Sequence, residues 1–349
     1  MKKISNGVYA FELEMERLGQ TSTIYPLLIF DGDTSAMIDA GLPTSIPEIE
    51  TQLSEVGLAI SDIDAFILTH QDLDHIGGLP ALVALAAEGT EVICHGAEEP
   101  YIEGTKQFGR LDPENLKTTF ESMPESLRDE MQKLVAEAKA YKGVAVTNTV
   151  EDGDVLPFGG GITVVHTPGH TEGHICLYLN ESGMLVAGDE LDLVDGGLFG
   201  PKHGLSADEE EAYASIAKLT KYDIESVLCY HGGFLQETPG SVLQSLRTWL
   251  LAAKKDKAGR FYGRQCGQGE RREAAHRASA NHIQVQEACQ FWLGNETDGR
   301  EAGYQPCRIH AAEGRGRQLG RQPFERKPNG HRAIPLRHQR SGVADAALA

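Results

Sequence analysis

Apolar runs alternate with amphipathic segments along the first half of the chain. Residues 24–30 (IYPLLIF) and 34–39 (TSAMID) are apolar runs separated by Asp31-Gly32-Asp33, a turn signal typical of a β-hairpin. A helix is expected after Pro47, where apolar residues recur at helical spacing before a glycine. Residues 63–69 (IDAFILT) then have the pattern of a buried strand. This alternation of strands and helices predicts a layered α/β domain.

A dense polar cluster, residues 70–75 (HQDLDH), follows that strand directly. In an extended loop alternate side chains point the same way, so His70, Asp72 and Asp74 can converge. A turn into a helix expected to open near Ile76 would bring His75 to the same cavity. Four metal-type ligands within six residues argue against a merely solvated loop and predict a metal site at a strand's carboxyl end. Such ligands suit zinc, or manganese or iron where carboxylates predominate.

Three distant segments repeat this arrangement, in which a strand leads into a ligand-type residue beside glycine. They are HTPGHTEGH with His170, VAGDE with Asp189 and CYHGG with His231. Glycine beside a ligand allows the backbone to approach a metal without a Cβ clash. Together with the polar cluster they supply seven candidate ligands from four strand ends, enough for two metals that share one carboxylate.

Further elements are expected on both sides of these motifs. Strands are predicted at 162–167, 175–179, 184–187 and 227–230, and helices at about 206–221 and 240–253. Residues 113–141 form a helical insert, in which apolar residues recur at helical spacing on both sides of Pro124. The insert either caps an active site or is an amphipathic hairpin that covers one face of the domain.

Charge divides the chain near Lys257. The whole chain has a net charge of −19. Residues 1–257 carry 17 basic and 42 acidic side chains, a net charge of −25, whereas residues 258–349 carry 15 and 9, a net charge of +6. The basic residues change from mostly Lys to mostly Arg at the same point, and apolar periodicity fades. We therefore expect a catalytic domain over 1–257 and a disordered tail over 258–349, whose composition resembles translation of an altered reading frame. A basic arm that binds nucleic acid is the alternative for the tail.

Composition also limits the location and the partners. The N-terminus lacks an apolar run of signal-peptide length, and no stretch approaches 18 apolar residues, so we expect a cytoplasmic protein without membrane contact. The six cysteines lack CxxC spacing, which argues against a disulfide framework or a thiolate zinc site. The strong negative charge of residues 1–257 disfavours nuclease action on a polyanion.

Over roughly residues 1–253 the chain resembles the metallo-β-lactamase-fold hydrolases of the glyoxalase II and lactonase type. The family pattern is HxHxDH followed by His, Asp and His, in the order seen here. The resemblance implies an α/β fold, a four-layer αββα sandwich of two mixed sheets. It also implies a ligand set: His70, Asp72 and His170 on a first metal, Asp74, His75 and His231 on a second, and Asp189 bridging them. Asp39, in IDAG, matches a carboxylate that orients a ligand histidine.

One residue departs from the family pattern, because Asp72 stands where the second histidine is usual. A carboxylate there hardens the first site, so iron or manganese becomes an alternative to zinc. The flavodiiron branch of the fold also has a carboxylate there, as glutamate, which makes a diiron oxidoreductase the alternative function. Nothing after residue 257 resembles a flavin-binding domain. A non-catalytic metal-binding protein is the third interpretation, should Asp72 impair the first site.

We expect a metal-dependent hydrolase with two zinc ions per chain, acting on a small ester, lactone or thioester through a metal-activated water. Asp74 is the candidate to orient the nucleophile and to pass a proton. A true β-lactamase is disfavoured by the missing secretory signal. His166 and His174 are expected to hydrogen-bond near the site without ligating, and His95 and His203 are assigned no role.

Overall fold

The computed structural model describes residues 1–17, 20–108, 111, 116, 125–201, 205–236, 254–255 and 261–262. The helix expected at 240–253, most of the tail at 258–349 and part of the 113–141 insert lie outside these ranges. Within the described part, no helix is both long enough and apolar enough to cross a bilayer.

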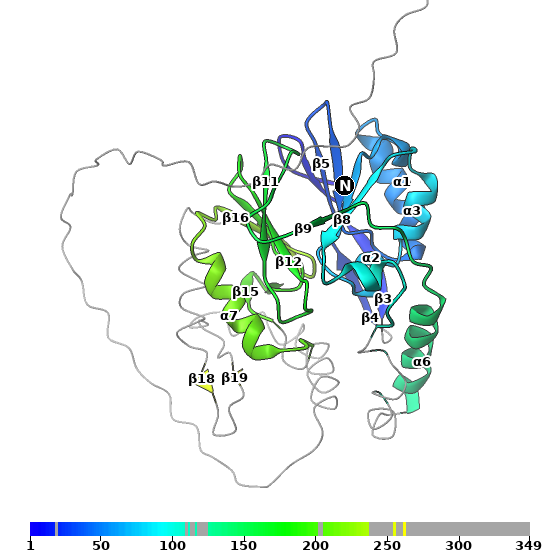
Figure 1. Ribbon diagram of the computed structural model, residues 1–349, viewed down its shortest axis with the longest axis vertical. Coiled ribbons are helices and arrows are strands. Elements are labelled where there is room, and N and C mark those ends of the chain that lie inside the picture. Colours follow the sequence, from blue (N-terminus) through cyan, green and yellow to red (C-terminus); the bar gives the residue numbers. More distant parts are fainter. Residues whose placement is uncertain are drawn as a thin grey trace, which may run out of the picture.

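Two mixed sheets form the centre of the fold (Figure 1). The first sheet has the strand order β1-β2-β5-β6-β7-β8-β9 and the second β10-β11-β12-β13-β16-β17. The strands of the first sheet are β1 (Lys2–Ser5), β2 (Val8–Ala10), β5 (Leu27–Phe30), β6 (Ser35–Ile38), β7 (Ala65–Ile67), β8 (Glu91–His95) and β9 (Asn148–Val150). Those of the second are β10 (Val155–Leu156), β11 (Ile162–His166), β12 (Ile175–Leu179), β13 (Met184–Val186), β16 (Ser226–Cys229) and β17 (Gly233–Gln236).

Separate two-stranded ribbons accompany the sheets. They are β3 (Leu13–Arg17) with β4 (Gln20–Ile24), β14 (Asp192–Val194) with β15 (Gly197–Phe199), and β18 (Lys254–Lys255) with β19 (Phe261–Tyr262). The helices are α1 (Ile46–Glu55), α2 (Leu73–Ile76), α3 (Leu79–Leu85), α4 (Glu99–Ile102), α6 (Glu125–Ala140) and α7 (Glu209–Leu219). Two short 3-10 turns, Pro43–Ser45 and Ile60–Asp62, complete the described elements.

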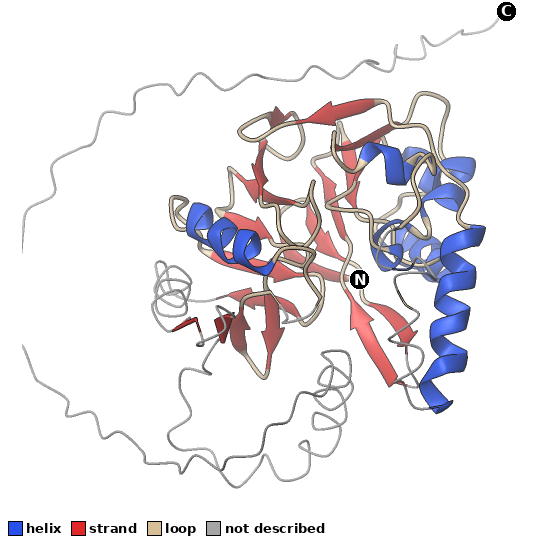
Figure 2. Ribbon diagram, turned by 60° about the horizontal axis from the view of Figure 1, so that its bottom comes forward, coloured by secondary structure: helices blue, strands red, loops and turns tan. Residues whose placement is uncertain are grey.

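The side chains of β7 explain the layering. Ala65 and Ile67 pack into the core between the two sheets, whereas Phe66 points to the opposite face and packs with α1 and α3. Both faces of this strand are therefore buried, which accounts for its unbroken apolar run. On the far side, α7 covers the second sheet through Tyr213 and Ile216. The result is the expected four-layer αββα sandwich, with helices outside both sheets (Figure 2).

The hairpin expected from the first two apolar runs is present as β5 and β6, paired antiparallel from Leu27↔Ile38 to Phe30↔Ser35. The helix near Pro47 begins one residue earlier, at Ile46, because proline is tolerated in the first turn, where its missing N–H has no helical partner. Two bounds differ from expectation: the apolar run 24–30 is divided between the end of β4 at Ile24 and β5 from Leu27, and the helix expected near Ile76 begins at Leu73. The amides of His75 and Ile76 both donate to the Asp72 carbonyl, so Asp74 and His75 lie in the first helical turn.

Candidate metal centre

The seven predicted ligands converge because four strands end at the same place. His70 and Asp72 follow β7, and Asp74 and His75 lie on α2 just beyond them. In the second sheet β11 and β13 both run antiparallel to β12, and β13 is parallel to β16. The carboxyl ends of β11, β13 and β16 therefore lie at one edge of the sheet. The loops after these three strands carry His170, Asp189 and His231.

Two groups of potential ligand atoms form at this edge. The first contains His70, Asp72, His170 and Asp189, and the second Asp74, His75 and His231; within each group the atoms lie within 4.8 Å of one another. The assignment of these residues as ligands of two metals stays a prediction; in the fold, Asp189 lies with the group of His70, Asp72 and His170.

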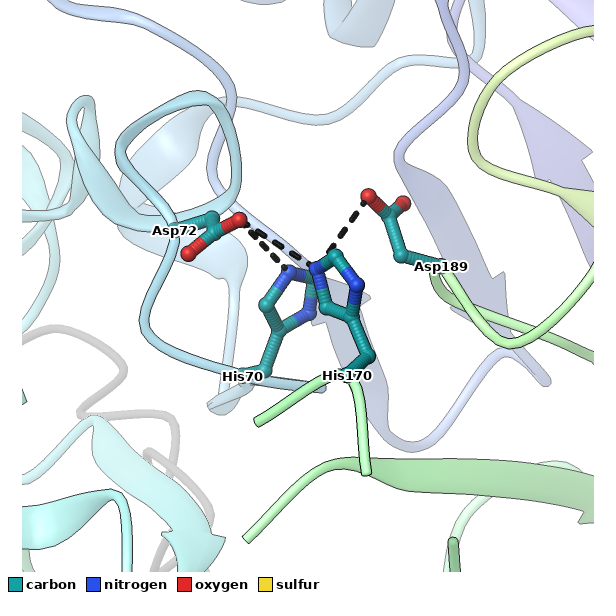
Figure 3. Close-up of side chains that lie close together, drawn as sticks. All are labelled: His70, Asp72, His170 and Asp189. Carbon is teal, nitrogen blue, oxygen red and sulfur yellow. Dashed lines mark hydrogen bonds and ion pairs between the residues drawn. The ribbon is translucent and has the colours of Figure 1, made fainter. Parts of the chain in front are cut away.

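The first group is drawn in Figure 3. The Nε2 of His170 lies 3.3 Å from Asp72 Oδ2 and 3.6 Å from Asp189 Oδ2. The Nε2 of His70 lies 3.7 Å from the same Asp72 oxygen. Asp72 comes from the opposite side of the site to Asp189, so the two carboxylates flank the imidazoles.

Asp189 reaches both groups through its two oxygens. Its Oδ2 faces His170, whereas its Oδ1 lies 3.2 Å from His75 Nε2 and 3.5 Å from His231 Nε2. In the second group His231 Nε2 also lies 3.2 Å from Asp74 Oδ2. A carboxylate with one oxygen toward each group has the geometry that a bridging ligand requires.

The buried polar atoms of the site test whether a cation fits. His70 Nε2, His75 Nε2 and Asp189 Oδ1 are buried without a partner in hydrogen-bonding geometry in the described part of the chain, and His75 Nε2 and Asp189 Oδ1 face each other as an ion pair at 3.2 Å. Such atoms are costly unless something satisfies them. The side chains of His70 and His75 are fully buried, whereas those of Asp72 and His231 are 29% and 21% exposed. The candidate site is therefore fully buried at His70 and His75 and reaches solvent at Asp72 and His231.

Contacts to the Nδ1 atoms, on the side of the rings away from the site, orient His70 and His75. Asp39 Oδ2 lies 2.9 Å from His75 Nδ1, and Asp39 Oδ1 accepts the Thr69 backbone N–H at 2.8 Å. The Thr69 hydroxyl lies 3.0 Å from His70 Nδ1. With Nδ1 engaged in this way, each ring directs Nε2 into the site. Asp39 thus contacts a candidate ligand histidine, as the family resemblance implies.

His174 hydrogen-bonds beside the site, as expected. Its Nε2 accepts the backbone N–H of Asp189 at 3.1 Å, and its Nδ1 lies 2.8 Å from the Thr167 hydroxyl. His166 Nε2 binds the Glu172 carbonyl, and its ring stacks on His95 with centroids 4.0 Å apart. His203 lies outside the described residues.

Burial and neighbouring charges shift the pKa values of the candidate ligands in different directions. Burial, followed by the neighbouring His75, lowers the pKa of His70 to about 4. Burial also acts to lower the pKa of His75, but the charges of Asp39 and Asp189 outweigh it and raise that pKa well above the ordinary value. Burial acts to raise the pKa of Asp189, yet the nearby His231 and His75 hold it well below the ordinary value. Since a metal ligand histidine must present a neutral nitrogen, metal binding to the second group competes with protonation of His75.

Sequence reasoning missed two buried residues that hold the site together. Glu98 accepts the Thr171 hydroxyl at 2.8 Å and the Gly173 N–H at 2.7 Å, which fixes the loop after His170. Burial raises the pKa of Glu98 to about 7. Tyr230 donates its hydroxyl to the Asp74 carbonyl. Glu98 lies outside the ligand motifs, and Tyr230 lies inside CYHGG, where only His231 was taken as functional; the sequence signal for each is its position beside a strand end.

The family follows from the comparisons with known proteins. The family model described as the metallo-beta-lactamase superfamily matches residues 22–263, so the chain belongs to this superfamily. The fold also resembles a crystal structure of a metallo-beta-lactamase family protein, TTHA1429, from Thermus thermophilus. The TM-score is 0.51 at 25% identity, over 70% of this chain and 78% of that one.

Curated relatives include proteins named as hydrolases. Two are from Bacillus subtilis: the probable metallo-hydrolase YqjP is 32% identical over 46% of this chain, and YflN is 30% identical over 56%. The chain spans 50% of the length of YqjP and 74% of that of YflN. The human acyl-coenzyme A thioesterase MBLAC2 is 28% identical over 54% of this chain and 64% of its own length.

Proposed function

We propose that the protein is a binuclear metallo-hydrolase. His70, Asp72 and His170 would hold the first cation, Asp74, His75 and His231 the second, and Asp189 would contact both. The observation that carries the proposal is the convergence of buried ligand-type atoms of His70, His75 and Asp189 at the edge of both sheets, where His75 and Asp189 face each other as an ion pair.

The proposed metal is zinc, because the four imidazoles are neutral nitrogen ligands of the kind that zinc prefers. Asp72 adds a hard oxygen ligand to the first group and makes that position the more tolerant of iron or manganese. Elemental analysis of the full chain purified without added metal distinguishes these cases. Two zinc ions per chain support a hydrolase, and iron with a visible absorption band supports the diiron alternative.

The proposed reaction is the hydrolysis of an electrophilic carbonyl compound. Two bound divalent cations would supply hydroxide near neutral pH and a Lewis acid for the carbonyl oxygen. The carboxylate of Asp74, only 7% exposed, orients the attacking water and carries its proton to the leaving group. His174 fixes the backbone of Asp189 and so keeps its two oxygens toward the two groups.

The proposed substrate is a small ester, lactone or thioester, of which a thioester has the most support. A relative named as an acyl-coenzyme A thioesterase supports it, as does a 26% identical relative from Maricaulis maris named hydroxyacylglutathione hydrolase. The exposed fractions of Asp72 and His231 indicate that the substrate enters on their side of the site. The net charge of −25 over residues 1–257 disfavours a nucleic-acid substrate.

Asp189→Ala tests the function. The variant should lose more than about 100-fold in turnover of a thioester or lactone, because it removes the carboxylate shared by both groups. Asp129→Ala, on the exposed face of α6, is the control and should retain wild-type turnover. Substantial activity in Asp189→Ala on any substrate that the wild type hydrolyses would contradict the two-metal proposal.

A further inference from the structure

Tyr230 is a buried aromatic residue at the junction of the site and the core. It follows β16 and directly precedes His231, and only 3% of its surface is exposed. Its carbonyl accepts the Tyr25 N–H at 3.1 Å, and its own N–H donates to the Gly188 carbonyl at 3.4 Å. The backbone of Tyr230 therefore joins the end of β16 to the loops before β5 and after β13.

The hydroxyl of Tyr230 supports the turn that carries Asp74. It donates to the Asp74 carbonyl at 2.5 Å. In a longer helix the amide four residues on would donate to this carbonyl. Here α2 ends at Ile76, and the Gly78 N–H donates instead to the Gly41 carbonyl at 2.8 Å. Tyr230 thus supplies the donor that this short helix lacks, from a point 156 residues away in the sequence.

The ring of Tyr230 supports two histidines. It stacks on His75 with centroids 3.7 Å apart and an angle of 29° between the planes. His75 is thereby held on its face by Tyr230 and at Nδ1 by Asp39. The same ring meets His231 edge to face, with centroids 5.3 Å apart and planes at 90°. These contacts reach all three residues of the second group.

We propose that Tyr230 is a positioning residue for the second metal, setting the placement of Asp74, His75 and His231 without ligating. The inference rests on the proposed binuclear function and adds a residue dedicated to one of the two cations. The hydrogen bond and ring contacts that Tyr230 makes to candidate ligands all go to members of the second group, while the rest of its side chain packs in the core. Loss of a residue that contacts and orients a metal ligand typically changes metal affinity by about 10- to 100-fold. Loss of the hydroxyl should therefore weaken the second site selectively.

The test is a titration of the full-length, chelator-treated chain with Co²⁺, followed through visible absorption. Wild type should bind two ions, and His231→Ala identifies which binding event belongs to the second group. Tyr230→Phe keeps the ring and removes the hydroxyl. It should weaken that event by about 10-fold and leave the other within about 2-fold. Tyr230→Leu, which also removes the stack on His75, should weaken it further.

Tyr178→Phe is the matched control, because its hydroxyl also donates to a backbone carbonyl, that of Asp223 at 3.0 Å, away from the site. It should leave both binding events unchanged. Wild-type affinities in Tyr230→Phe, or equal weakening of both events, would overturn the inference while leaving two-metal binding intact. Fewer than two Co²⁺ ions bound by wild type would instead refute the proposed function, and the inference with it.

Discussion

Replacement of Asp39 by Asn removes one charge from behind the site and changes little else. Asp39 has a positive φ of 61°, a conformation that Asn adopts about as readily as Asp. The carboxylate accepts from the Thr69 backbone N–H and lies 2.9 Å from His75 Nδ1. An amide has only one oxygen, so in Asp39→Asn either Thr69 or His75 must face an NH₂ group.

The expected effect of Asp39→Asn is estimated separately for protein stability and for metal affinity. A hydrogen bond to a charged group is worth about 1.5–3 kcal/mol, so the free energy of unfolding of the metal-free protein should fall by about 2 kcal/mol. Removal of a hydrogen-bond partner of a metal ligand typically lowers metal affinity by about 10- to 100-fold, which corresponds to about 1.4–2.7 kcal/mol. Urea denaturation measures the first quantity, and competition with a chromophoric chelator for Zn²⁺ measures the second.

Asp195→Asn is the control for this substitution. Asp195 also has a positive φ, 50°, but lies exposed in the turn between β14 and β15. It should retain wild-type stability and metal affinity. If Asp39→Asn matched wild type in both measurements, or if Asp195→Asn lost as much, the assignment of Asp39 as the partner of His75 would be wrong.

Three further predictions concern metal choice, pH and the C-terminal region. Asp72→His should shift bound metal toward zinc, because a neutral imidazole replaces a hard anion; unchanged content by elemental analysis would show that Asp72 is not a ligand. Burial raises the pKa of Glu98 to about 7, so the folded protein favours the protonated carboxyl. The resulting contribution to the free energy of unfolding is fully present below pH 4.5 and is lost as pH rises to about 7. Glu98→Gln should therefore gain stability relative to wild type between pH 5 and pH 8, by up to about 3 kcal/mol in urea denaturation of metal-free protein, and a constant difference would contradict this. We propose that the catalytic domain ends at about residue 257, so a chain truncated after Lys257 should keep its metal content and turnover; a soluble truncated protein without metal would refute that boundary.

The layered fold could be predicted from sequence where burial leaves a strong pattern. The β5–β6 hairpin and the strand β7 were recognisable because long apolar runs mark strands buried on both faces. The β3–β4 ribbon was not predicted, since its strands, LEMER and QTSTI, carry many polar residues. The early start of α2 was also missed, because a four-residue helix is too short to show periodicity.

The candidate ligands were predictable for a different reason from their supporting residues. His70 and Asp74 belong to a motif of local spacing, which is visible in the sequence itself. Glu98 and Tyr230 act through hydrogen bonds to residues 73 and 156 positions away. Only the folded chain brings such partners together, so local pattern carries no sign of their role.

The most direct test of the binuclear site is a crystal structure of the purified full-length chain with anomalous diffraction recorded at the metal's absorption edge. We predict two anomalous peaks: one among His70, Asp72 and His170, the other among Asp74, His75 and His231. Asp189 should lie between them. A single peak, or peaks elsewhere while these side chains contact one another directly, would contradict the binuclear site.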